Sequence, residues 1–280
     1  MLNKTFILFI IFFCNFIFSN VSSNEQLNFD ISQIEILDGG NKIIGKKRGK
    51  ITTNNGITIN ADQFEYDKVK NILKASGNIK IKDKINNYEV SSKNIVYFKN
   101  IEKIEIEGKS DFIINSNYNF KSEDVTILRK DKIISSDKNT SIINKENQTF
   151  YEIGKFSYSL KSEVLKGEEF FINTKYNQPF SDKYYFKTAI FNLKDQSYIA
   201  QDIDINLKKD LFGNKENDPR FKGTSSSSKN GITIIDKGIF TSCKKNDNCP
   251  PWTIQADKVT YDKNKKQILY DKALVKVYDV

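Results

Sequence analysis

The feature of this 280-residue chain that most constrains its fold is an alternating pattern that changes phase in its middle. In ITINADQFEYD (57–67), apolar and polar residues alternate as far as Ala61, and the alternation resumes one residue out of phase at Phe64 and Tyr66. WTIQADKVTYD (252–262) repeats this pattern. Side chains of a strand alternate between its two faces, so the second half would reach the wrong face unless the backbone bends or bulges. We therefore expect bent strands, with bends near residues 61–63, 92–94, 122–124 and 256–258.

The bent unit recurs along the chain. Its second arm carries an apolar residue about every 31 residues, at Tyr66, Tyr97, Ile127, Tyr158 and Leu193. Short polar turns such as YDKVKN and FKNIEK separate the copies, and polar turns between alternating runs are typical of β-hairpins. Outside the N-terminal apolar segment, the sequence has no convincing helical periodicity. The pattern predicts an all-β protein built of antiparallel hairpins.

Antiparallel hairpins with one apolar face can close into a barrel, pack as a β-sandwich or stack as an elongated bent sheet. A bend in every copy favours the third arrangement, in which the apolar faces line a trough, and a β-sandwich is the alternative. We expect one such domain over residues 34–280, after a short extension at 24–33. A loop is expected at about 208–230, where KKDLFGNKENDPRFKGTSSSSKN lacks alternation, although a domain boundary there is the other interpretation.

The N-terminus, MLNKTFILFIIFFCNFIFSNVSSN, combines one lysine, Lys4, with an apolar run over residues 6–18 that only Asn15 interrupts. Small residues follow at 21–23, as a cleavable secretory signal requires. We expect a signal peptide at 1–23 and export of the remaining chain. An uncleaved membrane anchor is the alternative, although the run is shorter than the roughly 20 residues that span a bilayer.

Histidine is absent from the chain, which removes the commonest general base and the commonest metal ligand. Nucleophile–histidine pairs and most zinc sites are thereby excluded, and the sequence has no glycine-rich phosphate loop. Lysine and arginine total 44 against 35 acidic residues, but the excess is spread along the chain, which argues against nucleic-acid binding. We expect no enzyme activity, no catalytic residue, no cofactor and no metal site.

Two cysteines lie in the stretch GIFTSCKKNDNCPPW (238–252), which also holds two prolines and the only tryptophan of the chain. Cys243 and Cys249 are close enough in sequence to form a local disulfide, whose short loop contributes roughly 2 kcal/mol in the chain-entropy model. The alternative is that both cysteines have partners elsewhere. Two thiolates alone do not complete a tetrahedral metal site. Trp252 is expected to pack at one end of the sheet.

Two stretches, ITINADQFEYDKVKNILKASGNIKIKD (57–83) and YEVSSKNIVYFKNIEKIEIEG (88–108), resemble the OstA-like domain of the lipopolysaccharide-transport proteins, which the LptA and LptD families share. The segment at 231–280, with FTSC and CPPWTIQADKVTYD, is similar to the part of LptD-family proteins that precedes their outer-membrane barrel. The resemblance covers about residues 34–280, and its most specific motifs lie in this last segment.

The resemblance implies an open β-jellyroll, a trough that holds the acyl chains of lipopolysaccharide and continues into the troughs of its partners. It implies a periplasmic domain that receives lipopolysaccharide from an LptA-like bridge protein and delivers it towards an outer-membrane barrel, with an LptE-like lipoprotein as a further partner. Cys243 matches a cysteine that forms disulfides between trough and barrel in the family. The sequence ends before any barrel strand, so we expect a truncated product. The alternatives are a standalone LptA-like bridge and a structural β-repeat protein without lipid binding.

Alternation assigns one face of each hairpin to the interior of the expected trough. Burial of an acyl methylene contributes about 0.8 kcal/mol, so a few inward residues would hold a lipid. Lys80 and Lys82 fall on the opposite face, where we expect the anionic headgroup. The candidate lipid-lining residues are Ile59, Phe64, Tyr66, Ile79, Ile81, Ile95, Tyr97, Val125 and Ile127.

Overall fold

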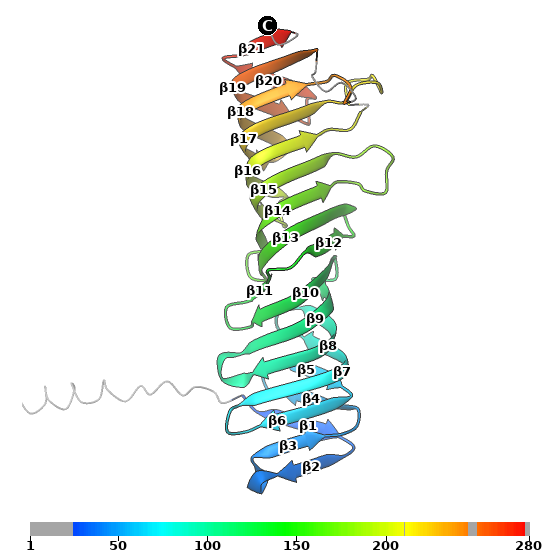
Figure 1. The fold of residues 1–280 in the computed structure, drawn as a ribbon, viewed down its shortest axis with the longest axis vertical. Helices are drawn as coiled ribbons and strands as arrows, with labels where there is room; N and C mark the ends of the chain where they lie inside the picture. Colours follow the sequence, from blue (N-terminus) through cyan, green and yellow to red (C-terminus); the bar gives the residue numbers. More distant parts are fainter. Residues whose placement is uncertain (1–24, 210, 246–250, 278–280) are drawn as a thin grey trace, which may run out of the picture.

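The structure, a computed structural model, describes residues 25–209, 211–245 and 251–277. The expected signal peptide at 1–23 lies outside these ranges. The 21 strands belong to one antiparallel sheet, whose layers follow one another in chain order along the long axis of the molecule (Figure 1). The expected all-β fold is confirmed. Within the described ranges, no helix is long and apolar enough to cross a membrane.

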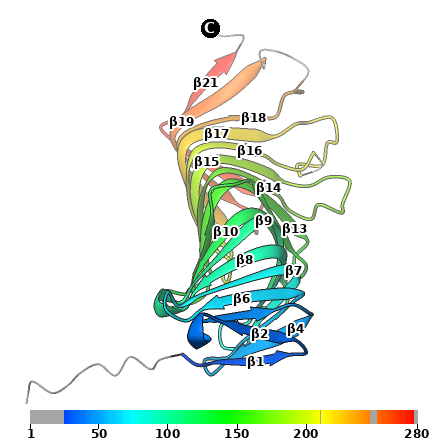
Figure 2. The same ribbon diagram turned by 60° about the horizontal axis from the view of Figure 1, so that its bottom comes forward.

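Most layers are one long strand that curves round the stack, and the others consist of two short strands (Figure 2). The long strands are β7 (Ile72–Asp83), β8 (Tyr88–Phe98), β9 (Lys103–Ile114), β10 (Tyr118–Leu128), β13 (Thr149–Ser159), β14 (Val164–Asn173), β15 (Lys183–Asn192), β16 (Ser197–Asn206), β17 (Arg220–Lys229), β18 (Ile232–Thr241) and β19 (Trp252–Asp262). The short pairs are β1 (Leu27–Ile31) with β2 (Ile34–Leu37), β4 (Gly49–Thr53) with β3 (Lys42–Gly45), β5 (Ile57–Ala61) with β6 (Gln63–Asp67), β12 (Thr140–Asn144) with β11 (Ile133–Ser136), and β21 (Leu274–Val277) with β20 (Gln267–Asp271). Two 3-10 turns, η1 (Asp38–Gly40) and η2 (Lys99–Ile101), lie in connections.

The bend divides the sheet into two arms. Arm A contains β1, β4, β5, β12, β21 and the halves of the long strands that continue them, and arm B contains β2, β3, β6, β11, β20 and the other halves. For example, β7 pairs with β5 over residues 80–83 and with β6 over residues 72–76. Each long strand therefore belongs to both arms.

The bends occur where the phase of the sequence pattern changes, so the expected positions are confirmed. β5 and β6 are separated at Asp62, and the pairing register shifts between Ser91 and Asn94 and between Glu123 and Val125. β19 changes its partner strand from β21 to β20 at the fourth expected position. Residues with positive φ that lie within bends are Gly77, Asn78, Gly108, Asp124, Glu169, Asp202 and Lys237.

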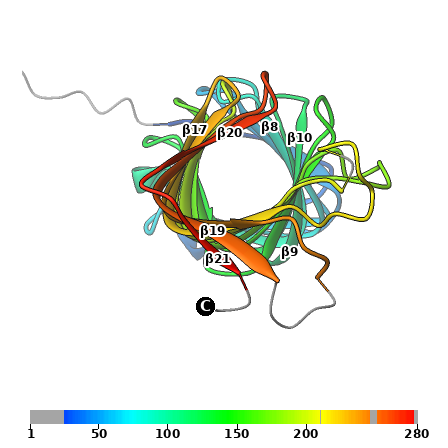
Figure 3. The same cartoon turned by 90° about the horizontal axis from the view of Figure 1, so that it is seen from above.

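The apolar faces of the two arms pack against each other and form one core. The ring of Phe120 in arm A lies 5.6 Å from that of Tyr158 in arm B, measured between centroids. The rings of Phe186 and Tyr198 make a similar contact at 5.2 Å. Seen along the long axis, the bent strands surround this core (Figure 3). The arms therefore cover each other's apolar side chains.

The sheet is open on the side away from the bend. There the turns that end arm A lie against the turns that end arm B, and we call the line between them the seam. Across the described parts of the chain, no backbone hydrogen bond or strand pairing crosses the seam. Side chains make the crossing contacts, as where Tyr118 Oη of arm A donates to Leu193 O of arm B at 3.1 Å. The sheet is bent and open rather than closed into a barrel.

Two expected boundaries are corrected. Residues 27–31 of the expected extension at 24–33 form β1 in the first layer. The expected loop at 208–230 is shorter, because its second half, from Arg220 onward, is β17. Serines interrupt the apolar pattern of this strand in the sequence. An inward-facing serine can take the place of an apolar residue when its hydroxyl group is hydrogen-bonded. Ser226 is buried in this way and donates to Tyr198 Oη at 3.4 Å.

A substitution at Gly167 in β14 would measure how tightly the inner corner of the bend is packed. A Cβ atom there would lie 2.4 Å from Lys155 O and 2.8 Å from Ile153 Cγ2. We expect Gly167→Ala to lower the free energy of unfolding by about 1–3 kcal/mol, because the backbone oxygen cannot move away without disturbing the sheet. The matched control is Gly154→Ala, whose nearest contact would be Glu169 Cβ at 3.2 Å. Urea unfolding measures both variants, and equal losses would contradict a tight corner.

Candidate functional site

All the expected lipid-lining residues lie on the inner face and belong to one cluster. Directly paired residues form rows across the strands of arm B. One row runs through Phe64, Ala75, Ile95, Ile106 and Val125, from β6 to β10. The remaining candidates are Tyr66, Tyr97 and Ile127 in the next row of arm B, and Ile59, Ile79 and Ile81 in arm A.

These side chains line a packed interior between the two arms of the bent sheet. Their residues are 0–6 % exposed, because the facing arm covers them. Two apolar faces that pack against each other are stabilised because each removes the other from water. The assignment of these residues to the inner face is confirmed, and their contact with a lipid stays a prediction.

The lysines expected near a headgroup lie outside the interior. Lys80 and Lys82 are exposed on the outer face of β7, and Lys82 forms an ion pair with Glu89 of β8. An exposed pair of this kind contributes little to stability. Both lysines are therefore placed where the alternation of β7 predicts.

The interior continues through the C-terminal half of the stack, which the candidate list did not include. Ring centroids of Phe170 in arm A and Phe191 in arm B lie 5.5 Å apart, and those of Phe221 and Tyr261 lie 6.1 Å apart. The same change of phase marks β14, β15 and β19 in the sequence, so the rule that located the first candidates could have located their residues, whereas serines interrupt the pattern of β17. The apolar interior extends over most of the length of the molecule.

The inner face is uncovered at both ends of the stack. In β2, Ile34 and Ile36 are 41 % and 65 % exposed, and in β21, Val275 and Val277 are 59 % and 47 % exposed. Each of them pairs with a residue of the inner face in the neighbouring strand. Within the described ranges, the outermost strands, β1 and β2 at one end and β20 and β21 at the other, each have one unpaired edge. Each end therefore presents apolar side chains and free strand edges.

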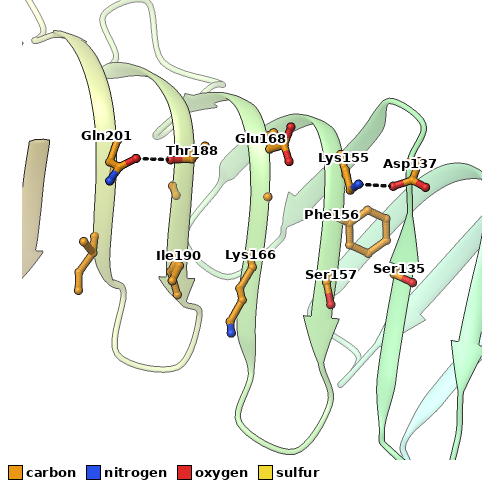
Figure 4. A pocket seen from close by; sticks show the side chains of 14 residues that line it. Ser135, Asp137, Lys155, Phe156, Ser157, Lys166, Glu168, Thr188, Ile190 and Gln201 are labelled. Carbon is orange, nitrogen blue, oxygen red and sulfur yellow. Dashed lines mark hydrogen bonds and ion pairs between the residues drawn. The ribbon is translucent and has the colours of Figure 1, made fainter. Parts of the chain in front are cut away.

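A hollow with a volume of about 630 Å³ lies along the bend, over β11 and β13 to β16 (Figure 4). Its rim carries the ion pair of Lys155 and Asp137 at 2.9 Å. Thr188 Oγ1 donates to Gln201 Oε1 beside it at 3.3 Å. These four polar side chains therefore pair with each other at the rim of the hollow.

The described part of the cysteine stretch, residues 238–245 and 251–252, lies near the C-terminal end of the stack. Trp252 begins β19, and its ring lies 6.1 Å from that of Phe240, which confirms the expected packing at an end of the sheet. Cys243 is half-buried, with Sγ 3.8 Å from Trp252 O. Cys249 lies outside the described residues, so its disulfide with Cys243 stays a prediction. In the part of the chain that the structure describes, no group of acidic or cysteine side chains could hold a metal ion.

Comparison with known proteins adds no identity to this picture. A scan against protein-family models finds no match for the chain, and a search of curated proteins finds no significant relative.

A substitution at Tyr118 tests the hydrogen bond that its hydroxyl makes across the seam between the arms. Its buried hydroxyl has a pKa raised from 10.0 to about 12 by burial, and it donates to Leu193 O at 3.1 Å. We expect Tyr118→Phe to lower the free energy of unfolding by about 1 kcal/mol at neutral pH. An unfolded tyrosine loses its proton near pH 10.0 and the folded Tyr118 only near pH 12, so its stabilising contribution is complete below pH 10.0 and is lost as the pH rises to about 12.

Urea unfolding at a series of pH values measures this effect. The difference between the wild-type protein and Tyr118→Phe is expected to shrink as the pH rises above 10.0. The matched control is Tyr185→Phe, at an exposed position on the outer face of β15. A difference that is independent of pH, or an equal loss in the control, would contradict the buried contact.

Proposed function

We propose that the protein is the periplasmic lipopolysaccharide-binding domain of an LptD-like protein. It receives lipopolysaccharide from an LptA-like bridge of similar jellyrolls and delivers it towards an outer-membrane barrel for assembly at the cell surface. The segment at 1–23 would direct its export, and the domain would act without enzyme activity or cofactor. The sequence resemblance over residues 34–280 and the open, bent sheet support this proposal.

The observation that carries the proposal is the continuous apolar interior, which is uncovered at both ends of the stack. An amphipathic lipid needs an apolar path for its acyl chains and a polar exterior for its headgroup. The inner face supplies the path, and outer lysines such as Lys80 and Lys82 supply positive charge. Each buried methylene contributes about 0.8 kcal/mol, so a few inward residues hold a chain firmly and still release it in steps.

The two ends fit partners of the same architecture. A second jellyroll placed on either end would extend the sheet by strand addition and cover the exposed inner face. At the N-terminal end it would cover Ile34 and Ile36, and at the C-terminal end it would cover Val275 and Val277. We assign the N-terminal end to the LptA-like bridge and the C-terminal end to the barrel side, where an LptE-like lipoprotein would be present.

The packed interior favours a second candidate, a structural β-repeat protein. A scaffold needs a stable core and no space for a ligand, and the burial of the candidate lining residues meets that need. A standalone LptA-like bridge would share the lipid-binding interior with the first proposal. Lipid capture therefore separates the scaffold from both lipid-binding alternatives.

Photo-crosslinking separates these functions. A benzophenone side chain at Ile79 or Tyr97 is expected to capture lipopolysaccharide, because both positions face the interior. The matched controls are Lys80 and Lys82 on the outer face of the same sheet, where the same probe is expected to capture little. Capture that is equal from both faces, or absent from the inward positions with an LptA-like partner present, would contradict lipid binding and favour the structural scaffold.

A further inference from the structure

If the interior binds lipid, as proposed above, the arms must part to admit it, because the lining residues are buried. The arms cannot part at the bend, because each long strand runs through both of them. Parting them at the seam breaks only side-chain contacts, since no backbone hydrogen bond crosses it within the described ranges. The contacts across the seam therefore control access to the interior.

A buried ionic cluster joins the arms in the N-terminal part of the seam. Arg129, the first residue of an arm B turn, donates from Nε to Asp83 Oδ2 in arm A at 2.9 Å. Its Nη2 donates to Asn55 O in an arm A turn at 3.2 Å, and its Nη1 donates to Glu102 Oε2 in the preceding arm B turn at 3.1 Å. The side chains of Arg129 and Asp83 are 2 % and 0 % exposed. We call this cluster the Arg129 clasp.

Glu25, which precedes β1, adds a second buried carboxylate to the clasp. Its Oε1 lies 3.8 Å from Arg129 Nη1 and has no hydrogen-bond partner among the described residues, and its Oε2 accepts a hydrogen bond from the Tyr97 hydroxyl. One guanidinium thus faces the carboxylates of Glu25, Asp83 and Glu102. Burying more negative than positive charge is costly, and that cost is removed when water reaches the carboxylates.

The position of Arg129 recurs along arm B. At six arm B turns, the first residue donates its backbone N–H to the carbonyl oxygen of the preceding arm B turn. At one such turn, Lys263 crosses the seam to Asp182 with an Nζ–Oδ2 distance of 3.1 Å. At two others, leucines packed in or against the core occupy the position. The equivalent residues are Lys68, Lys99, Arg129, Leu160, Leu193 and Lys263.

We propose that the Arg129 clasp is the releasable closure of the N-terminal interior. When its hydrogen bonds break, the arms part beside it and acyl chains reach Ile81 and Tyr97. In two later arm B turns, Leu160 and Leu193 occupy the position of Arg129 and close the seam with apolar contacts. Parting leucines exposes apolar surface to water, whereas parting the clasp hydrates its charges, which offsets much of the lost attraction. The clasp therefore opens at a lower cost than the leucine-lined stretch.

Paired spin labels measure the separation of the arms directly. Labels at Ile85→Cys and Lys130→Cys lie on exposed turns on either side of the clasp and form the N-terminal pair. Labels at Asn177→Cys and Lys265→Cys lie on exposed turns farther along the seam and form the C-terminal pair. Both pairs are introduced into the full exported chain, with its own cysteines replaced by serine and without lipid.

Arg129→Met removes the guanidinium and keeps an extended side chain. We expect it to broaden and lengthen the distance distribution of the N-terminal pair and to leave the C-terminal pair unchanged. The matched control is Arg48→Met, which breaks an exposed ion pair at the bend, where Arg48 Nη1 lies 2.8 Å from Asp62 Oδ1. This control should change the distance distribution of neither pair of spin labels. An unchanged N-terminal pair, or equal broadening of both pairs, would overturn the proposal.

A second variant covers the case in which Arg129→Met does not fold. Arg129→Leu combined with Asp83→Asn and Glu25→Gln copies the leucine closure and leaves no unpaired buried charge. We expect this variant to keep the N-terminal pair at the wild-type distance or closer. A longer distance than in the wild-type protein would contradict the account of the clasp.

The second measurement is photo-crosslinking of lipopolysaccharide, supplied as micelles, to a benzophenone probe at Ile81. Capture is expected to rise severalfold in Arg129→Met and to fall severalfold in the leucine variant. Equal capture in all variants would overturn control of access by the clasp. A seam that opens in Arg129→Met without any capture would support the clasp and contradict the proposed lipid binding.

Discussion

A strand that changes its buried face half-way along can keep its apolar side chains out of water only by folding over at that point. In this chain the fold-over occurs at small inner-corner residues such as Ala61, Gly167 and Gly238. Because backbone hydrogen bonds join each layer to the next, a bend in one layer must be matched by its neighbours. The two arms, the interior between them and the seam all follow from this constraint.

The same apolar residues serve two competing purposes. With nothing between the arms, they stabilise the fold by covering each other, and the interior is packed. A lipid in the interior would replace one arm's contacts with acyl contacts of similar chemistry, so the exchange need not cost much hydrophobic stabilisation. What opposes it is the separation of the arms, and this makes the polar contacts of the seam the adjustable part of the molecule.

The sequence predicts the bends and the inner face because both depend on local alternation, as Ile59, Phe64 and Tyr66 illustrate. It does not predict the Arg129–Asp83 contact, which joins residues 46 positions apart and depends on how the arms lie against each other. Nor does it predict the packed interior, since alternation assigns a face but not what covers it. Ser226 shows a further limit, because a buried, hydrogen-bonded serine breaks the apolar pattern of a real strand.

The central claim is that acyl chains lie between the arms, and nuclear Overhauser effects between lipopolysaccharide and isoleucine methyl groups test it most directly. In perdeuterated protein with protonated isoleucine methyls, the account predicts contacts from acyl-chain protons to Ile59 and Ile81. It predicts none to Ile113 and Ile199, which are 44 % and 64 % exposed on the outer face. Contacts only to the outer isoleucines, or none at saturating lipid, would contradict it.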